Sequence, residues 1–446
     1  TKPVSVYAPA LDDGTITAAS AIDDYPVRDL PGYGAWPSNS GSGFRGLTSF
    51  YTALVRSLNT CAVRTVEELG TYQSYTFMVE KLGFTTLTQA DSQQSGNMGL
   101  GGYEYGVTTE EMAAAYGAFV NDGVYTPPRT FYRVEDSQGN LVCENNKESH
   151  VAMKQTTAYI IRQTLKSVIT SGTGGEARFS GMTIAGKTGT TSSNYDRYFV
   201  GYTPYYTAAV WIGYDQNASI RANGNPAAQL WKKAMSEAHE NLPNQNFNGS
   251  TAAMTQVTVC TRTGLLQGPG CTDVQTVWVA ASNAPALVCD GHVAVNLCTE
   301  SGKLATEYCP AECVQSVNAI DFTTENLTAA WGYERTTILL PLSAAEYEAY
   351  AAQQAADPTF VIPAGKPVQA NDSGSVFSDL MMLGPCTLHQ YVEPEPTPGE
   401  GYYDENGNWV PAGETDPTNP TDPEGSEEVS PEQGTDFLNW LLNTAA

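Results

Sequence analysis

Three short segments in the first half of the chain carry side chains that could move a proton and hold an anion. They are Thr1-Lys2, Ser57-Leu58-Asn59 and Lys187-Thr188-Gly189-Thr190. A lysine amine of lowered pKa can take a proton from a hydroxyl, and a lysine beside threonine hydroxyls can hold a carboxylate. Singly, each has an ordinary interpretation: a cap or turn for Ser-x-Asn, a chance match for Lys-Thr-Gly, and a solvated terminus for Lys2.

The sequence around these segments predicts a mixed α/β region over residues 1–245. Apolar spacing indicates three helices, at 49–56, 109–120 and 155–170. The second follows a threonine cap, has acidic residues in its first turn and is followed by Gly123. Aromatic and β-branched residues indicate a strand at 205–214, with 199–202 as the other arm of a hairpin.

Composition limits the class of protein. The chain has 446 residues, with 22 lysines and arginines against 48 aspartates and glutamates, so its net charge is −26. The length predicts two or three domains with enough apolar residues for a core. The negative charge argues against nucleic acid and against docking on anionic lipid. The sequence has no apolar run that could span a membrane and no signal segment, and it does not begin with Met, so we expect a fragment.

Composition also divides the chain into three zones, at 1–245, 246–390 and 391–446. The second zone carries most of the cysteines and a predicted helix at 343–356. The third contains 13 acidic residues, eight prolines and neither lysine nor arginine, which predicts disorder. An apolar patch at 436–442 ends it and either docks on a surface or frays. We find no internal repeat by inspection.

The order of the three segments matches a known family. Penicillin-binding proteins carry Ser-x-x-Lys, then Ser-x-Asn, then Lys-Thr-Gly. Over about residues 1–240 the chain resembles the transpeptidase domain of the bifunctional class A type. The resemblance is carried by residues 36–39, 45–48, 53–63, 99–102, 106–108, 112–116, 121–123, 185–191, 199–204 and 209–215.

This resemblance implies an α/β fold of the α+β type, with an antiparallel sheet flanked by helices. It also implies a D,D-transpeptidase that cleaves D-Ala–D-Ala stem peptides through a serine acyl-enzyme, cross-links peptidoglycan and binds penicillin. The residues that it implicates in catalysis are Lys2 as base, Ser57 as proton relay, Asn59 as a hydrogen-bonding partner and Lys187 as a source of positive potential. Those that it implicates in substrate binding are Thr188, Gly189 and Thr190.

One departure from the family pattern concerns the nucleophile. If Lys2 is the lysine of Ser-x-x-Lys, the serine lies two residues before Thr1, outside this sequence. We therefore expect the chain to be cut within the motif and inactive alone. The longer protein would carry an upstream membrane anchor and a peptidoglycan glycosyltransferase domain, and would work on the extracytoplasmic face of a bacterial membrane. Its partners would be stem peptides, β-lactams and cell-wall synthesis proteins, not nucleic acid.

The cysteines of the second zone admit two interpretations. Six of the nine cysteines fall between Cys260 and Cys313, and the four histidines lack zinc spacing with one another. Cys298, Cys309 and Cys313 could indicate a thiolate metal site. In an exported protein we favour disulfides, of undetermined connectivity, and expect no metal or other cofactor.

Other functions stay open at this point. A β-lactam sensor, a D,D-carboxypeptidase and a non-catalytic wall scaffold could share the fold. A different chemistry would use Thr1 as an N-terminal nucleophile with its own amine as base.

Overall fold

The computed structural model describes residues 1–30, 34–41, 44–321, 324–331 and 385–389, and short pieces at 339–340, 352, 366–367, 401–403 and 409–411. The chain divides into two compact units, Thr1–His389 and Gln390–Ala446. Apart from the short pieces, the helix expected at 343–356, the acidic tail at 391–446 and the patch at 436–442 lie outside the described residues. Among the described residues, no helix combines the length and the apolar character needed to cross a bilayer.

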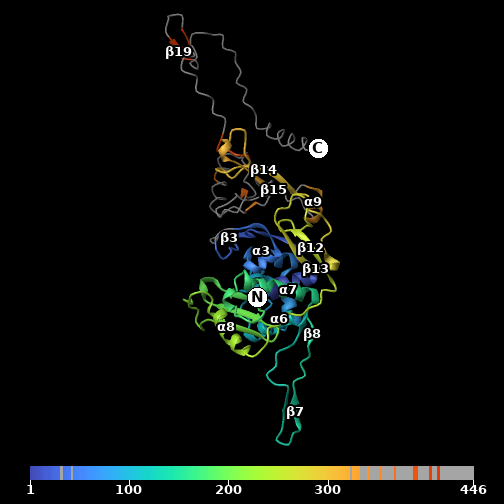
Figure 1. Cartoon of the computed structure of the whole chain (residues 1–446). Coiled ribbons are helices and arrows are strands. Elements are labelled where there is room, and N and C mark those ends of the chain that lie inside the picture. Colours follow the sequence, from blue (N-terminus) through green and yellow to red (C-terminus); the bar gives the residue numbers. More distant parts are fainter. Residues whose placement is uncertain are drawn as a thin grey trace. The chain divides into compact units, whose positions relative to one another are not determined.

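The first unit contains a three-stranded antiparallel sheet, drawn in green near α8 in Figure 1. Its order is β11-β10-β9, and its strands are β9 (Ala185–Thr190), β10 (Arg197–Tyr202) and β11 (Thr207–Ile212). The predicted hairpin is therefore confirmed, with a second strand shorter than 205–214. It starts later because the Thr203 hydroxyl accepts the backbone N–H groups of Tyr205 and Tyr206, which holds both residues in the turn.

Helices pack against this sheet, as the resemblance implies. The helices expected at 109–120 and 155–170 are α6 (Thr109–Val120) and α7 (Gln155–Thr170), and a third is α8 (Pro226–Ala238). The start of α6 is fixed by Thr108 and Glu111, whose side chains cap the helix reciprocally. The helix expected at 49–56 is α2 (Phe50–Arg56), with Ser49 as its cap.

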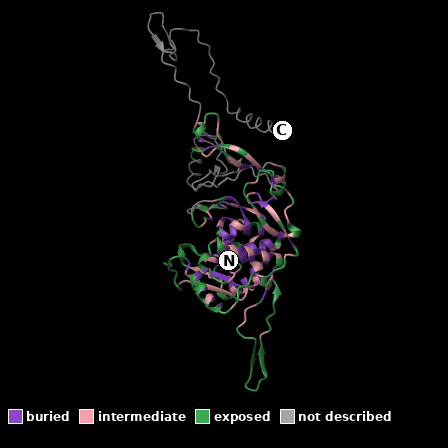
Figure 2. Cartoon of the chain, viewed as in Figure 1, coloured by how far each residue is buried: buried purple, intermediate pink, exposed green. Residues whose placement is uncertain are grey.

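Alternating residues of β10 face two apolar cores. Val200 and Tyr202 join the large core that contains helices α6 and α7, and the Tyr202 ring packs edge-on against Tyr116. Phe199 points to a smaller core, where it meets Trp231 of α8. Figure 2 shows the buried residues gathered in these helices and the sheet. This arrangement confirms the expected fold class.

The first unit contains further helices and short strand pairs. Its further helices are η1 (Pro3–Tyr7), α1 (Ala8–Asp13), α3 (Asn59–Leu69), α4 (Thr71–Thr76), η2 (Phe77–Lys81), η3 (Asp91–Gln93), α5 (Ser95–Leu100), η4 (Gly175–Ala177), η5 (Ser192–Asn194), η6 (Ala281–Asn283), η7 (Ala311–Cys313) and α9 (Glu325–Trp331). Its short strand pairs are β1 (Ala21–Asp24) with β4 (Gly46–Ser49), β2 (Arg28–Leu30) with β3 (Gly34–Trp36), β5 (Val124–Tyr125) with β8 (His150–Val151), β6 (Arg133–Glu135) with β7 (Leu141–Glu144), and β16 (Leu339–Leu340) with β17 (Lys366–Pro367). In the second unit, β18 (Gly401–Tyr403) pairs with β19 (Trp409–Pro411).

Two similar hairpins follow the transpeptidase-like region, and they correct two expectations. They are β12 (Met254–Cys260) with β13 (Val274–Ala280), and β14 (His292–Cys298) with β15 (Val314–Ile320). Each hairpin is seven residue pairs long and begins its turn at a cysteine, so the expectation of no internal repeat is wrong. The expectation of disulfides is also wrong, because all nine cysteines carry free thiols in the structure.

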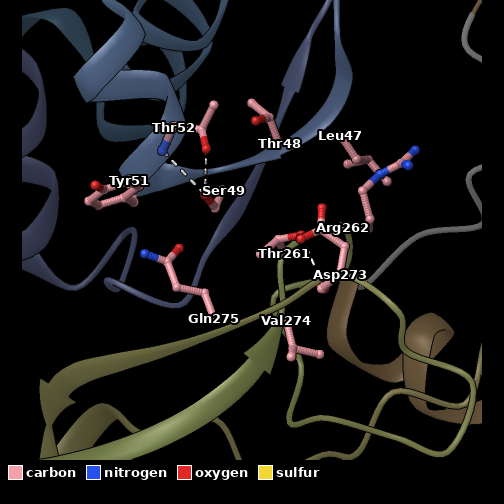
Figure 3. A pocket seen from close by; sticks show the side chains of 10 residues that line it. All are labelled: Leu47, Thr48, Ser49, Tyr51, Thr52, Thr261, Arg262, Asp273, Val274 and Gln275. Atoms are coloured by element: carbon pink, nitrogen blue, oxygen red, sulfur yellow. Dashed lines mark hydrogen bonds between the residues drawn. The ribbon is translucent and has the colours of Figure 1, made fainter. Parts of the chain in front are cut away.

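The first of these hairpins meets the start of α2. A cavity of about 240 Å³ lies between them. Figure 3 shows Thr48, Ser49 and Thr52 on one side of it and Thr261 and Asp273 on the other. None of the predicted site residues lines this cavity, so it is separate from the predicted chemistry.

Candidate active site

The fold brings the three predicted segments together around one hydroxyl group. Lys187 Nζ lies 2.8 Å from Ser57 Oγ. Lys2 Nζ lies 3.4 Å from the same oxygen and 3.1 Å from the Ser57 carbonyl oxygen. Lys2 Nζ also donates to Asn59 Oδ1 at 2.6 Å. Two lysine amines therefore meet at one serine hydroxyl, which gives a proton a short path between them.

Each of these side chains is held by a different element. Lys2 has helical dihedral angles and precedes η1, Lys187 is a buried residue of β9, and Asn59 begins α3. Ser57 ends α2 in the left-handed conformation, with φ 62°. A residue other than glycine in that conformation is uncommon and marks a locally constrained turn, here the one that carries the Ser57 hydroxyl to both amines.

A buried carboxylate holds the Asn59 end of the cluster in place. The Asn59 backbone N–H donates to Asn39 Oδ1 at 2.7 Å, and Asn39 Nδ2 donates to Asp24 Oδ1 at 2.6 Å. Asp24 is fully buried and also accepts the Arg45 backbone N–H at 2.8 Å and the Thr60 hydroxyl. The sequence reasoning missed Asp24, because an acidic residue on a short strand carries no motif, and it saw Asn39 only as part of a family-like stretch.

We expect Asp24→Ala to lower the free energy of unfolding by about 3 kcal/mol, because it leaves the Asn39 amide and the Thr60 hydroxyl without an acceptor. Urea denaturation of this chain measures the change. The control is Asp13→Ala, since Asp13 is exposed and its side chain hydrogen-bonds only to Thr15 among the described residues. Equal midpoints for the two variants would contradict the role assigned to Asp24.

The predicted substrate-binding residues continue along β9 towards solvent. Lys187 is buried, Thr188 and Gly189 are half-buried, and Thr190 is exposed. The Thr188 and Thr173 hydroxyls lie 2.8 Å apart, and the sequence reasoning missed Thr173 because it belongs to a loop without a motif. A Cβ atom at Gly189 would lie 3.0 Å from Tyr198 Cβ, so this position favours glycine. Since β9 ends the β11-β10-β9 sheet, its outer edge can pair with an extended peptide.

Burial makes both lysine ammonium groups easier to deprotonate than a solvent-exposed lysine. Burial, with the charge of the nearby Lys2 as a smaller cause, lowers the pKa of Lys187 to about 7. Burial also lowers the pKa of Lys2, to about 8. A substantial fraction of neutral amine is therefore present near neutral pH, which a general base requires.

The sequence profile of the penicillin binding protein transpeptidase domain matches residues 1–236 of this chain. The chain belongs to this family. Among curated relatives, Penicillin-binding protein 1A of Clostridium acetobutylicum is 36% identical over 249 residues, covering 54% of this chain and 30% of that protein. Penicillin-binding protein 1A of Clostridium botulinum, strain Hall, is 32% identical over 329 residues, covering 71% of this chain and 39% of that protein.

A solved structure supports the transpeptidase fold. The crystal structure of Penicillin-Binding Protein 1A from Haemophilus influenzae aligns with a TM-score of 0.53 at 22% identity, covering 64% of this chain and 48% of that one. The chain spans 30% and 39% of the length of the Clostridium acetobutylicum and Clostridium botulinum relatives, which is well under half of each. The geometry of the transpeptidase region brings together all four predicted catalytic residues and places the three predicted substrate-binding residues on the strand that carries Lys187.

Proposed function

We propose that this chain carries the acyl-transfer site of a serine D,D-transpeptidase that acts on D-Ala–D-Ala stem peptides of peptidoglycan and is acylated by penicillin. The observation that carries the proposal is the contact of the Ser57 hydroxyl with both Lys2 and Lys187. A hydroxyl between two amines of lowered pKa suits repeated proton transfer. Burying two lysine amines side by side would not stabilise the fold, so a purely structural role does not explain the pair.

The nucleophile in this proposal is a serine two residues before Thr1 in a longer protein. Lys2 has φ −40° and ψ −43°, so a helix continued backwards from Lys2 would place the residue three positions earlier on the same face. That spacing puts a serine hydroxyl within reach of the Lys2 amine. Proline at position 3 suits the early turns of a helix, where backbone N–H groups have no intrahelical partner.

Acylation then follows from the positions of these groups. The serine oxygen attacks the carbonyl carbon of the penultimate D-Ala, and its proton passes to neutral Lys2. The Ser57 hydroxyl relays a proton to the departing amine as the C–N bond breaks, so D-Ala leaves as a neutral amine and the acyl group stays on the serine. In the second half, the amine of a neighbouring stem peptide attacks the acyl-enzyme, gives up a proton through the same relay and restores the serine.

The substrate lies along β9 in this proposal. The stem peptide pairs with the outer edge of the strand, and its terminal carboxylate is held by the Thr188 and Thr190 hydroxyls near the positive potential of Lys187. Gly189 lets the peptide backbone approach closely. The backbone N–H groups of Thr190 and of the nucleophilic serine stabilise the oxyanion, a contribution of about 3–4 kcal/mol per donor in comparable sites.

The longer protein that we propose has further parts. Its relatives are named Penicillin-binding protein 1A, and we infer a peptidoglycan glycosyltransferase domain and a membrane anchor upstream. The site would then face the cell wall from the extracytoplasmic side of the membrane. Its partners would be stem peptides, β-lactam antibiotics and other cell-wall synthesis proteins.

Release of D-Ala from a synthetic stem pentapeptide by the longer protein tests this function. We expect D-Ala release together with a cross-linked dimer when an acceptor amine is supplied. Release without a dimer would indicate a D,D-carboxypeptidase, and penicillin binding without release would indicate a sensor. A longer protein that neither releases D-Ala nor binds penicillin would be a scaffold, which would refute the proposal.

The rate of acylation by penicillin should rise with pH between about 6 and 9 and then level off. Below this window both lysines are protonated, because the pKa of Lys187 is about 7 and that of Lys2 is about 8, so no amine can act as base. The two lysines interact, so the profile reports the pair. Stopped-flow measurements with a fluorescent penicillin on the longer protein give this profile; a rate independent of pH from 6 to 9 would contradict a lysine base.

A further inference from the structure

Three cysteines and one histidine gather at the end of each of the two similar hairpins. The first group is Cys260, Cys271, Cys289 and His292, and the second group is Cys298, Cys309, Cys386 and His389. Within each group the sulfur and ring-nitrogen atoms lie within 4.8 Å of one another. Both groups have the same order along the chain, Cys-x10-Cys followed by Cys-x2-His. In both, the first and third residues are buried and the other two are half-buried.

The backbone around the two groups is also equivalent. The third cysteine of each group donates its backbone N–H to a carbonyl in the loop between the first two cysteines. This bond runs from Cys289 to Leu266 in one copy and from Cys386 to Leu304 in the other, at 2.8 Å in both. The same arrangement therefore occurs twice. In the second copy, the last cysteine and the histidine come from a segment much later in the sequence.

In each group, a backbone N–H group donates a hydrogen bond to a cysteine sulfur atom, as is common at thiolate sites. The Gly268 N–H donates to Cys271 Sγ, and the Thr306 N–H donates to Cys309 Sγ, both at 3.3 Å. In each case the donor lies three residues before the cysteine. Such bonds stabilise negative charge on sulfur, which metal binding requires and which a neutral thiol would use only weakly.

Each histidine has one nitrogen in its group and the other nitrogen held by a side-chain oxygen. His292 Nε2 lies 3.2 Å from Cys260 Sγ, while its Nδ1 lies 3.0 Å from Asn318 Oδ1. His389 Nδ1 lies 3.5 Å from two sulfur atoms of its group, while its Nε2 lies 3.1 Å from Glu300 Oε2. A second partner of this kind fixes the ring and the tautomer of a metal-ligating histidine.

We propose that each group binds one Zn²⁺ in a closed, four-coordinate structural site. Three thiolates and one imidazole are a donor set typical of structural zinc, and tetrahedral Zn–S bonds of about 2.3 Å place sulfur atoms about 3.8 Å apart. A disulfide arrangement fits less well, because three thiols in one group can form only one bond and leave a cysteine over. Zinc is no part of the proposed acyl transfer, so this inference stands apart from the proposed function.

Each of the two zinc ions would connect separate chain segments. The first would tie the turn of β12–β13 to the start of β14, through Cys289 and His292. The second would tie the segment at 385–389 to the turn of β14–β15. The first hairpin also packs against the large core, through Met254, Val259 and Val279. The second has only a small apolar cluster around Leu297 and Ala319 among its described residues, so metal bonds would supply much of its stability.

Zinc content of the whole chain tests the proposal. The chain is purified under reducing conditions, incubated with excess zinc sulfate, desalted and analysed by elemental mass spectrometry. We expect two zinc ions per chain, and protection of six cysteines from iodoacetamide until a chelator is added. Zinc near zero, or alkylation of these cysteines that zinc does not slow, would overturn the proposal.

Matched variants separate the two sites and guard against misfolding. Cys271→Ser and Cys309→Ser should each retain one zinc ion per chain, so that the untouched site reports that the rest of the region is folded. The control is Cys313→Ser, because Cys313 lies beside the second group but donates to Glu300 Oε1 at 3.0 Å and belongs to neither group. This control should retain two ions. Loss of zinc from the control alone, with both ions kept in the other variants, would show that the ligands are wrongly assigned.

Discussion

Lys2→Met should lower the rate of acylation by penicillin about 10³-fold in the longer protein that carries the upstream serine. The variant removes the amine that takes the serine proton, and positioned general bases typically contribute between about 10² and 10⁴. Methionine keeps most of the length and volume of the lysine side chain, so the effect should arise from the lost amine. The measurement is the second-order rate constant with a fluorescent penicillin.

The control for this prediction is Lys147→Met, because Lys147 is exposed and, among the residues that the structure describes, its amine hydrogen-bonds only to the Pro128 carbonyl. That variant should acylate at the parent rate. A Lys2→Met protein that kept more than a tenth of the parent rate would contradict the role of Lys2 as base. Circular dichroism of both variants checks that the fold is intact.

Trp231→Ala should lower the free energy of unfolding of this chain by about 3–5 kcal/mol. Trp231 is fully buried in the smaller core. Its ring packs edge-on against Phe199 with centroids 5.0 Å apart, and its Nε1 donates to the Ala208 carbonyl at 3.0 Å. Removing it leaves a cavity under β10 and β11, which hold β9 and Lys187 in register. Urea denaturation followed by far-ultraviolet circular dichroism measures the loss.

The matched control is Trp211→Ala. Trp211 lies on β11, is 45% exposed and donates to Asp196 Oδ1 at 2.9 Å. We expect it to cost about 1 kcal/mol or less, because little apolar area is removed from the core. Equal losses for the two tryptophan variants would mean that the smaller core does not support the sheet.

The sequence predicted the elements whose ends are marked by local chemistry. Helix α6 has a reciprocal cap at Thr108 and Glu111, and the expected bounds 109–120 coincide with the observed ones. The motif residues Ser57 and Lys187 were predicted because their order along the chain matches a family. Local caps and chain order are properties that one sequence carries directly.

Contacts made across the fold could not be predicted in this way. Asp24 and Thr173 support the site through partners far away in the sequence, and neither belongs to a motif. The repeated cysteine–histidine group was missed for a related reason. Cys386 and His389 are far from Cys309 in the sequence, so the second copy does not show its spacing until the chain is folded.

The site of penicillin attachment tests the central claim most directly. The longer protein is treated with a fluorescent penicillin, digested, and its labelled peptide is located by mass spectrometry. We predict one adduct, on the serine three residues before Lys2, and no adduct on the 446-residue chain that begins at Thr1. An adduct on Thr1 or on any other residue of this chain, or no adduct on the longer protein, would contradict the account.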